Sequence, residues 1–448
     1  ITKPITMSLD YDTHNPEFEK AMNLVASTNA NLFLTGEAGT GKTHFLTTTS
    51  DRIKKPYVVL APTGVAAQYA GGVTIHSFFQ LPIRSYMGQF DIPGYTKLKL
   101  KILESIKLIF IDEVSMVRAD LLDWINKILQ SVHKSQLPFG GVQMVLIGDP
   151  FQLSPIVTYS EKRIYSDYDS PYFFSSNVFE QAMFSHIELK KQYRQSDDKF
   201  LGILNRIRNR KTESADLQML NERVLKNGDK LDLEKSIFLT THVSNAEMTN
   251  TNMLEKLSSP IKIYDWIQSG QAVKLSTAVA KLRLAIGAKV MVNKNIRLDN
   301  ARLYNGQIGR VSRLEEDVVL IVIDGNEYRI EREEWISYKY SYNVESKMVQ
   351  REEVSRISQF PLILAWAITI HKSQGLTFES LIADVSNSFS EGQVYVALSR
   401  CKSLEGIKLT QSLDEKSIKV NPKVVDFMKK SNPSELVDLR ILLNSNNG

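Results

Sequence analysis

The chain has 448 residues, of which 43% are apolar and 23% charged, and its formal net charge is +5. This composition is typical of globular proteins and excludes wholesale disorder, and no uncharged apolar run reaches the roughly 18 residues that a membrane-spanning helix needs. The single cysteine, Cys401, excludes an intramolecular disulfide and a cysteine-based zinc site. We therefore expect an intracellular protein, cytoplasmic and nucleoid-associated if it is prokaryotic, and the mild basic charge leaves nucleic acid open as a partner.

Short apolar runs in the first part of the chain predict buried parallel strands. Residues 119–132 carry apolar side chains at helical spacing between two of these runs, and such alternation is typical of a doubly wound α/β sheet. Between residues 80 and 100 the pattern lapses into an insertion with two prolines and two glycines. The four runs lie at residues 31–34, 57–62, 107–112 and 142–148.

A second α/β set follows, with predicted strands at residues 236–241, 361–369 and 380–385. From about residue 276 to 356 it is interrupted by short runs of alternating apolar and polar residues. Asn305-Gly306 and Asp324-Gly325 stand at turn positions between these runs. This texture predicts a small antiparallel barrel inserted into the second α/β domain.

The sequence therefore predicts two doubly wound α/β domains with one insertion in each. The expected bounds are residues 1–79 and 101–175 for the first domain, 80–100 for its insertion, 176–275 and 357–430 for the second domain, 276–356 for its insertion and 431–448 for a terminal tail.

Residues 36–43, GEAGTGKT, fit the phosphate-binding pattern G-x-x-x-x-G-K-[ST] between a predicted strand and a predicted helix. Small residues there let backbone N–H groups surround phosphates at a helix N-terminus. Lys42 would reach the β and γ phosphates, and the Thr43 hydroxyl would bind Mg²⁺. An ordinary glycine turn is the alternative, which the flanking pattern disfavours. The candidate ATP-binding residues here are Gly36, Ala38, Gly39, Thr40, Gly41, Lys42, Thr43 and His44.

Two acidic residues end the predicted strand LIFIDE. Asp112 would hold Mg²⁺ through water, and Glu113 would polarise the attacking water. A pair of surface charges is the alternative, and the phosphate loop upstream makes it weaker. A later strand ends at Gly148-Asp149, and Gln152 just beyond it could sense the γ-phosphate or stand in a solvated turn. Together these residues predict hydrolysis of a nucleoside triphosphate.

Eight segments occur in a fixed order along the chain: GEAGTGKT, APTGVAA, VTIHSFF, IDEVSM, GDPFQLSP, QYRQ, AITIHKSQGLTF and VYVALSR. They resemble the motif set of superfamily-1 helicases of the 5′-to-3′ branch that includes RecD. Residues 113–132 and the following FGGVQMVLIGD resemble the signature of the Pif-one (petite integration frequency) family within that branch. The resemblance covers about residues 30 to 405. It implies two RecA-like domains that close on ATP, a wedge in the first insertion and an SH3-like barrel in the second.

The resemblance also implies two phosphate-facing arginines, which match Arg194 in QYRQ and Arg400 in VYVALSR. A charged guanidinium fork supplied by the opposite domain would make hydrolysis depend on domain closure. The other arginines of the basic stretch around them, Arg206, Arg208 and Arg210, are expected on a solvated or DNA-facing surface.

One position departs from the family pattern. Relatives commonly carry a glutamine that reads adenine ahead of the phosphate loop, and Phe18 stands at that place here. Its ring could stack on the base or pack in the core. Selectivity for ATP over other triphosphates is therefore less firmly predicted than hydrolysis.

Polar residues at strand ends in both α/β halves predict a track for single-stranded DNA, because such tracks combine phosphate contacts with stacking surfaces. Each residue alone is more typical of a capped turn than of a DNA contact, but their joint appearance at matching places in both halves favours the track. In the insertion at 80–100, Tyr86, Phe90 and Tyr95 are candidates for contacting a duplex junction or for a local core. The candidate DNA-binding residues are Pro62, Thr63, Gly64, Thr74, His76, Ser77, Phe78, Thr241, His242, Asn245, Asn250, His371, Lys372 and Ser373.

Residues 368–380, ITIHKSQGLTFES, are expected to link the ATP site to the DNA-binding residues, with Gly375 on the ATP side. The sequence and its resemblance thus predict an ATP- and Mg²⁺-dependent DNA helicase that moves 5′-to-3′ on single-stranded DNA and unwinds forked or tailed duplexes. The resemblance is compatible with action on G-quadruplexes and with roles in replication, repair, recombination or telomere maintenance. We expect a monomer, because one chain supplies both halves of the ATP site. A phosphate-loop kinase and a DNA clamp without unwinding remain open as alternatives.

Overall fold

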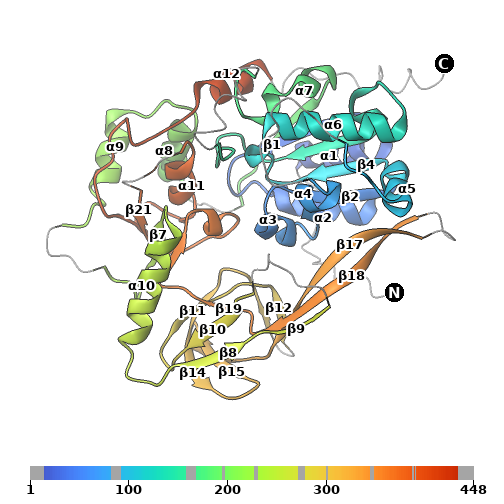
Figure 1. Ribbon diagram of the computed structural model, residues 1–448. Helices are drawn as coiled ribbons and strands as arrows, with labels where there is room; N and C mark the ends of the chain where they lie inside the picture. The colour runs from blue at the N-terminus through green and yellow to red at the C-terminus, as the bar shows by residue number, and fades with distance from the viewer. Residues whose placement is uncertain are drawn as a thin grey trace.

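The computed structural model describes residues 15–81, 92–157, 168–193, 197–226, 231–270, 278–298, 301–343, 348–385, 388 and 390–431, without the side chains of 337–343 and 348–352. Arg194, Tyr86 and Phe90 lie outside the described residues. Figure 1 shows three parts: a parallel sheet with its helices (blue to cyan), a smaller parallel sheet with helices (green and red), and antiparallel strands (yellow to orange).

The first sheet has six strands in the order β3-β2-β4-β5-β1-β6, and all neighbours are parallel. The sequence predicted the four interior strands of this sheet. Its strands are β1 (Leu32–Gly36), β2 (Tyr57–Ala61), β3 (Val73–Thr74), β4 (Leu108–Ile111), β5 (Gln143–Ile147) and β6 (Ser185–Leu189).

Helices cover both faces of this sheet, which explains why its strands read as continuous apolar runs. Val58 and Leu60 of β2 belong to the core shared with α4, α5 and α6, whereas Val59 belongs to the core shared with α1 and α2. The helices of this part are α1 (Pro16–Ser27), α2 (Lys42–Arg52), α3 (Gly64–Tyr69), α4 (Ile75–Phe79), α5 (Lys97–Ser105), α6 (Ala119–His133) and α7 (Asn177–Gln181).

The last strand of the first sheet lies beyond the domain boundary expected at residue 175. β6 pairs in parallel with β1 from Leu32↔Ser185 to Gly36↔Leu189. A strand that alternates half-exposed and buried positions gives a weaker apolar signal than the interior strands. We therefore propose that the first α/β domain ends after Leu189.

The second sheet has four parallel strands in the order β20-β7-β21-β22. The run predicted as one strand at 361–369 is divided, because β19 (Leu362–Leu364) pairs with the antiparallel strand β11 and only its continuation joins the second sheet. The elements of this part are β7 (Ile237–Thr240), β20 (Ala367–Thr369), β21 (Leu381–Asp384), β22 (Ile407–Leu409), α8 (Asp198–Arg208), α9 (Ser214–Asn221), α10 (Val243–Glu255), α11 (Gln393–Leu398) and α12 (Pro422–Lys430).

The antiparallel part runs from residue 262 to 364, wider than the expected 276–356, because its first and last strands pair only with strands distant in sequence. The Asp324-Gly325 turn joins β15 to β16, with Ile323 paired to Asn326. Its strands besides β19 are β8 (Lys262–Asp265), β9 (Ile267–Gly270), β10 (Lys281–Leu284), β11 (Lys289–Val292), β12 (Ile296–Leu298), β13 (Ala301–Leu303), β14 (Ile308–Leu314), β15 (Val319–Ile323), β16 (Asn326–Ile330), β17 (Glu333–Asn343) and β18 (Met348–Gln359).

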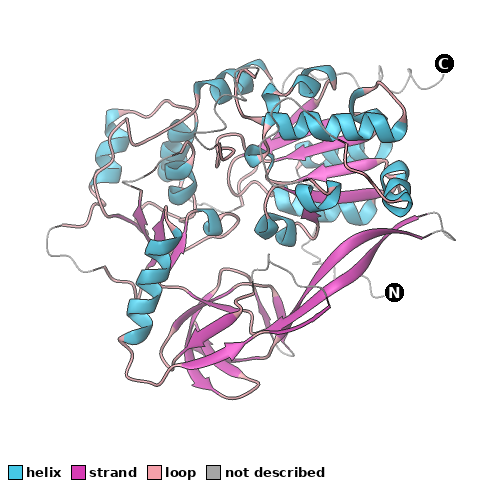
Figure 2. Ribbon diagram, in the orientation of Figure 1, coloured by secondary structure: helices cyan, strands magenta, loops and turns pink. Residues whose placement is uncertain are grey.

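The long hairpin β17–β18 leaves the antiparallel part and reaches helix α5 of the first part (Figure 2). β9 adds a third strand at the base of this hairpin. Among the residues that the structure describes, no helix is both long and apolar enough to cross a membrane.

Candidate nucleotide and DNA site

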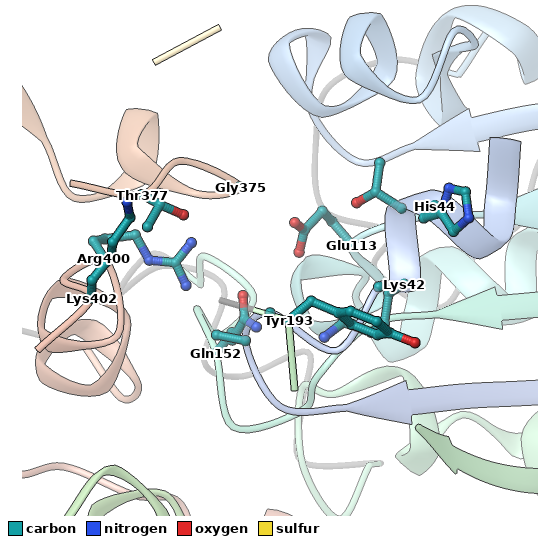
Figure 3. Close-up of a pocket in the computed structure, with 13 residues that line it drawn as sticks. Lys42, His44, Glu113, Gln152, Tyr193, Gly375, Thr377, Arg400 and Lys402 are labelled. Atoms are coloured by element: carbon teal, nitrogen blue, oxygen red, sulfur yellow. The ribbon is translucent and has the colours of Figure 1, made fainter. Parts of the chain in front are cut away.

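A cavity of about 440 Å³ lies between the carboxyl ends of the first sheet and the loops of the second (Figure 3). Lys42 and Glu113 lie on one side of it, and Arg400 and Lys402 lie on the other. Ligands of parallel α/β sheets bind at this edge of the strands. The lining residues are Ala38, Gly39, Gly41, Lys42, Thr43, His44, Glu113, Gln152, Tyr193, Gly375, Thr377, Arg400 and Lys402.

The phosphate loop leaves β1 at Gly36 and enters α2 at Lys42. Gly39 and Gly41 have φ of 93° and 89°, values that side chains disfavour. At Gly36 a Cβ atom would lie 2.5 Å from Thr40 Oγ1 and 2.6 Å from the carbonyl oxygen of Leu189, so only glycine fits there. The loop thus has the tight backbone that presents N–H groups to a phosphate.

The two predicted carboxylates follow β4, where Glu113 lines this cavity and Asp112 lines a neighbouring one. Asp112 is buried, and this burial, followed by the charge of Glu113, raises its pKa to about 7. Glu113 has a left-handed backbone with φ of 51°, which places strain at this point. At Gly148 a Cβ would lie 2.9 Å from the amide nitrogen of Val114, so glycine allows the ends of β4 and β5 to approach each other.

Gln152 and Arg400 both line the cavity, as the sequence predicted, and both side chains are otherwise buried. The Arg400 guanidinium bonds to its own helix end, with Nε 2.9 Å from the carbonyl oxygen of Val396 and Nη2 2.8 Å from Ser399 Oγ. These bonds hold the side chain while its guanidinium extends into the cavity (Figure 3).

Within the basic cluster, Arg210 is exposed and Arg206 partly exposed, as predicted for a solvated surface, whereas Arg208 is buried and contradicts that prediction. Arg208 is only 4% exposed and bonds Asp149 through Nε at 3.2 Å and Nη2 at 3.1 Å. Arg206 forms a bidentate pair with Asp216. Both arginines therefore have acidic partners within the protein, and we withdraw them from any DNA-facing surface.

Of the two alternatives for Phe18, stacking on a base or packing in the core, the structure shows the second. Phe18 is buried, with its ring centroid 5.3 Å from that of Phe45, so it packs in the core. Tyr193 lies over the loop instead, where its N–H donates to the carbonyl oxygen of Gly39 at 3.0 Å. Tyr193 lines the cavity together with His44.

Sequence reasoning missed Tyr193, Thr377 and Lys402 as cavity residues. Each stands within two residues of a position that it did select, namely Arg194, Gly375 and Arg400. Their position next to these motif residues is the sequence feature from which they could have been predicted.

The first half of the candidate DNA track contains two capped turns and one buried ring. Thr63 and Thr74 each accept a hydrogen bond from the helix that they precede, at 3.1 Å and 3.2 Å. Ser77 is exposed, whereas Phe78 is 3% exposed and packs against Phe79 with Lys99 over its face. A ring buried in this way has no face for a base, so Phe78 is removed from the track. Pro62, Gly64 and His76 are partly exposed and remain.

The second half contains a residue that holds the fold together. Asn250 donates to the carbonyl oxygen of Ala367 at 2.7 Å and accepts from the amide of Ala367 at 2.9 Å, so both ends of its amide are used. We therefore remove Asn250 from the track. Thr241 is buried and bonds the exposed His242 at 2.7 Å, and Asn245 is partly exposed.

The loop after β20 lies between the two candidate sites. Gly375 lines the nucleotide cavity, and it also lines a neighbouring cavity of about 470 Å³ that includes Thr63, His371 and Lys372. Ser373 is fully buried and its hydroxyl donates to the carbonyl oxygen of Ile370 at 2.7 Å, so it fixes the turn and cannot meet a phosphate. Burial lowers the pKa of His371.

A family model described as PIF1-like helicase matches residues 14–218. The ATP-dependent DNA helicase Pif1 of Bdellovibrio bacteriovorus is 32% identical over 425 residues, which cover 93% of this chain and 91% of the relative. The chain belongs to the PIF1-like helicase family. The ATP-dependent DNA helicase PIF1 of Danio rerio is 31% identical over 454 residues, and there the match covers 97% of this chain but 66% of the relative.

Solved structures of the family agree with this fold. The Bacteroides sp Pif1 complex with ADP-AlF4 has a TM-score of 0.86 at 39% identity, covering 93% of this chain and 96% of that chain. Bacteroides Pif1 bound to single-stranded DNA has a TM-score of 0.65 at 38% identity, covering 93% and 96%. The chain therefore superposes more closely on the ADP-AlF4 complex than on the complex with single-stranded DNA.

Proposed function

We propose that this PIF1-like helicase uses ATP to move 5′-to-3′ along single-stranded DNA and thereby separates duplex DNA. The cavity between the two parallel sheets carries the proposal, because one lining contains the phosphate loop and Glu113 of the first sheet together with Gly375 and Arg400 of the second. A nucleotide bound there would touch both halves. Its binding and hydrolysis would therefore change how the halves sit relative to each other, which is how many enzymes gate their cycles.

Within this site, Lys42 would neutralise the β and γ phosphates and Glu113 would orient and polarise the attacking water. Gln152 would contact the γ-phosphate from the end of β5. Arg400, and Arg194 from the segment after Tyr193, would approach the γ-phosphate when the halves close. Because the Arg400 guanidinium already extends into the cavity while it bonds its own helix end, closure would bring it toward the γ-phosphate without a large rotation of the side chain.

Thr43 and Asp112 would hold Mg²⁺, with Asp112 acting through water. The buried Asp112 suits a neighbouring cation, since the charge of Glu113 contributes to raising its pKa to about 7. Within the described part of the chain, no three His, Cys, Asp or Glu side chains gather as a metal site, and Mg²⁺ in such enzymes takes much of its shell from phosphates and water. When bound, Mg²⁺ would supply positive charge that offsets the negative charge of the phosphates.

The DNA strand would cross the carboxyl ends of both sheets. From the first half it would meet Pro62, Thr63, Gly64, Thr74, His76 and Ser77, and from the second half Thr241, His242, Asn245, His371 and Lys372. Burial lowers the pKa of His76 and of His371, so both rings are neutral hydrogen-bonding groups at pH 7 and not fixed charges. Lys372 is the exposed basic side chain of the loop that reaches the nucleotide cavity.

The remaining parts would have roles around this motor. We assign the two parallel-sheet parts to RecA-like domains, residues 80–100 to a strand-separating wedge, and residues 262–364 to an SH3-like barrel with its long hairpin. One chain supplies both sides of the nucleotide cavity, so the working unit would be a monomer. G-quadruplex DNA would be a further substrate, with roles in replication, repair or recombination.

Unwinding assays on duplexes with a single 5′ or 3′ tail test the proposal. The 5′-tailed substrate should be unwound and the 3′-tailed one should not, and both unwinding and hydrolysis should stop when EDTA removes Mg²⁺. DNA-stimulated hydrolysis without unwinding of either substrate would identify a clamp instead. ADP release that depends on a small acceptor and not on DNA would identify a kinase.

A further inference from the structure

A buried chain of hydrogen bonds joins the phosphate loop to helix α11. The backbone N–H of Ala38 donates to the Tyr395 hydroxyl at 3.3 Å, and that hydroxyl donates to Asp149 Oδ2 at 3.3 Å. Tyr395 is 4% exposed and Asp149 is fully buried. One hydroxyl thus connects three segments: the loop after β1, the loop after β5 and a helix of the second part.

Arg208 of α8 completes this group. Its guanidinium bonds both oxygens of Asp149, lies 3.6 Å from Glu188 Oε1 and stacks 4.5 Å from the ring centroid of Phe151. The backbone N–H of Phe151 adds a further bond to Asp149 at 3.2 Å. A buried carboxylate with this many donors keeps one orientation, since breaking a buried pair leaves an uncompensated charge. Asp149 therefore offers Tyr395 a fixed acceptor.

Helix α11 is also held at its start and leads directly to the arginine of the cavity. A Cβ at Gly392 would lie 2.2 Å from the carbonyl oxygen of Gln152, so the helix begins against the Gln152 loop. Tyr395 stands one turn further, and Arg400 follows the helix end while bonding to the carbonyl oxygen of Val396 at 2.9 Å. Any displacement of the Tyr395 hydroxyl therefore moves helix α11, from whose end the Arg400 side chain extends.

We propose that Tyr395 is a positioning residue that registers helix α11 against the phosphate loop and so sets where Arg400 enters the nucleotide cavity. The inference rests on the proposed ATP hydrolysis and adds the route by which the loop and the second half are aligned. When the loop closes on phosphates, the Ala38 N–H moves with it, and the hydroxyl passes that movement to α11. The Asp149–Arg208 pair stays in place during this movement, because Arg208 holds Asp149 in one orientation.

Tyr395→Phe tests the proposal, because it keeps the buried ring and removes only the hydroxyl. We expect kcat for DNA-stimulated ATP hydrolysis to fall roughly tenfold or more, as for a misplaced catalytic group, with little change in KM for ATP. Tyr172→Phe is the matched control. It removes a hydroxyl of a similarly buried tyrosine in the same core cluster, and that hydroxyl bonds Ser154 and Asn421 rather than the phosphate loop. It should lower the melting temperature comparably and leave kcat unchanged.

A double-mutant cycle with Arg400→Ala separates positioning from general destabilisation. If Tyr395 acts through Arg400, the double variant should be no slower than Arg400→Ala alone. Losses that multiply, or a Tyr395→Phe kcat equal to wild type, would overturn the inference while wild-type hydrolysis still supports the proposed function. Absence of DNA-stimulated hydrolysis in the wild type would instead overturn that function. Should Tyr395→Phe not fold, Arg208→Lys, which keeps the charge but not the fork on Asp149, carries the same expectations.

Discussion

The ammonium group of Lys42 donates a hydrogen bond of 2.7 Å to the carbonyl oxygen of Gly36. A second bond of 2.8 Å goes to the carbonyl oxygen of Glu37. Both acceptors belong to the phosphate loop, so the loop itself holds the amine at the edge of the cavity. A triphosphate could then bind without first drawing Lys42 in from solvent, which is the preorganisation that electrostatic catalysis needs.

Replacing Lys42 or Glu113 should abolish ATP hydrolysis without removing the binding of single-stranded DNA. Lys42→Ala and Glu113→Gln should each lower DNA-stimulated ATP hydrolysis at least about a hundredfold, because one removes charge stabilisation and the other the group that activates water. Steady-state hydrolysis with and without single-stranded DNA measures the loss. Fluorescence anisotropy should show single-strand affinity close to wild type, and near-normal turnover in either variant would contradict the assignment.

Tyr193 should matter for nucleotide affinity rather than for chemistry. Tyr193 is 53% exposed and lines the cavity above the loop. Tyr193→Ala should raise KM for ATP about fivefold, the effect of losing one aromatic contact of about 1 kcal/mol, with kcat nearly unchanged. Tyr193→Phe, which keeps the ring, is the control. A KM that is equal in both variants and wild type would show that the base binds elsewhere.

The same site should distinguish bases weakly. Phe18 stands where relatives carry a base-reading glutamine, and it is buried against Phe45, so it offers no hydrogen bond to a base edge. Stacking alone is tolerant of base identity because every base has a π-face. We expect kcat/KM for GTP within about tenfold of that for ATP, and a discrimination of a thousandfold in parallel assays would point to a base-reading group not yet identified.

The sequence predicted which segments meet, but not which of their side chains are free of bonds within the protein and can contact a ligand. The phosphate loop, Glu113, Gln152 and Arg400 do share one cavity, because spacing along strands and loops determines which ends come together. Availability depends on tertiary contacts that a local pattern does not contain. Arg208 is buried because of Asp149, which stands 59 residues away.

Asn250 shows the same limitation at a single residue. A polar side chain after a strand has the same sequence signature whether it waits for a phosphate or bonds backbone groups, as this one does with both polar atoms of Ala367. The extent of the antiparallel part was underestimated for a related reason. The pairing of β8 with β10 and of β19 with β11 is non-local and leaves no periodic signal.

Asn250 and His242 should therefore separate stability from DNA binding. Asn250→Ala leaves the amide and carbonyl of Ala367 without partners and should reduce the free energy of unfolding by about 1–3 kcal/mol. Its affinity for single-stranded DNA, measured where it is fully folded, should match wild type. His242→Ala, at an exposed position, should show the reverse pattern. Similar losses of DNA affinity in both variants would show that Asn250 does contact the DNA.

Lys289 gives a pH dependence of stability with a definite sign. It is buried, its ammonium donates to the carbonyl oxygens of Leu233 at 2.7 Å and Ser236 at 2.8 Å, and burial lowers its pKa to about 8. An unfolded lysine keeps its proton to about pH 10.4. Between these values the unfolded chain binds more protons, so the free energy of unfolding gains from this group as pH rises from about 8 to 10.

Denaturant unfolding at pH 8, 9 and 10 measures that gain. Other groups titrate in the same range, so the quantity of interest is the difference between wild type and Lys289→Met, which keeps most of the side-chain volume. The difference should move in favour of the wild type with rising pH, because only the wild type loses the cost of charging a buried amine. A difference that stays constant across the three pH values would place the Lys289 pKa near its ordinary value.

Ser373 should affect how hydrolysis is coupled to unwinding more than either activity alone. Its buried hydroxyl fixes the His371–Ser373 turn through the carbonyl oxygen of Ile370. This turn contains Lys372, and the chain continues from it to Gly375 in the nucleotide cavity. Ser373→Ala should loosen the turn, so a change at Gly375 would reach Lys372 less reliably. The number of base pairs separated per ATP hydrolysed should fall, as measured by unwinding and hydrolysis in one reaction.

The control for this prediction is Ser236→Ala, which removes a similarly buried hydroxyl that bonds Ser380 Oγ at 2.7 Å at the other end of the second sheet. It should cost stability comparably and leave the ratio of base pairs to ATP unchanged. Because loss of folded protein lowers both activities together, only a change in their ratio reports on coupling. If unwinding and hydrolysis fall in strict proportion in Ser373→Ala, the turn is a structural support and the link between nucleotide and DNA runs through other residues.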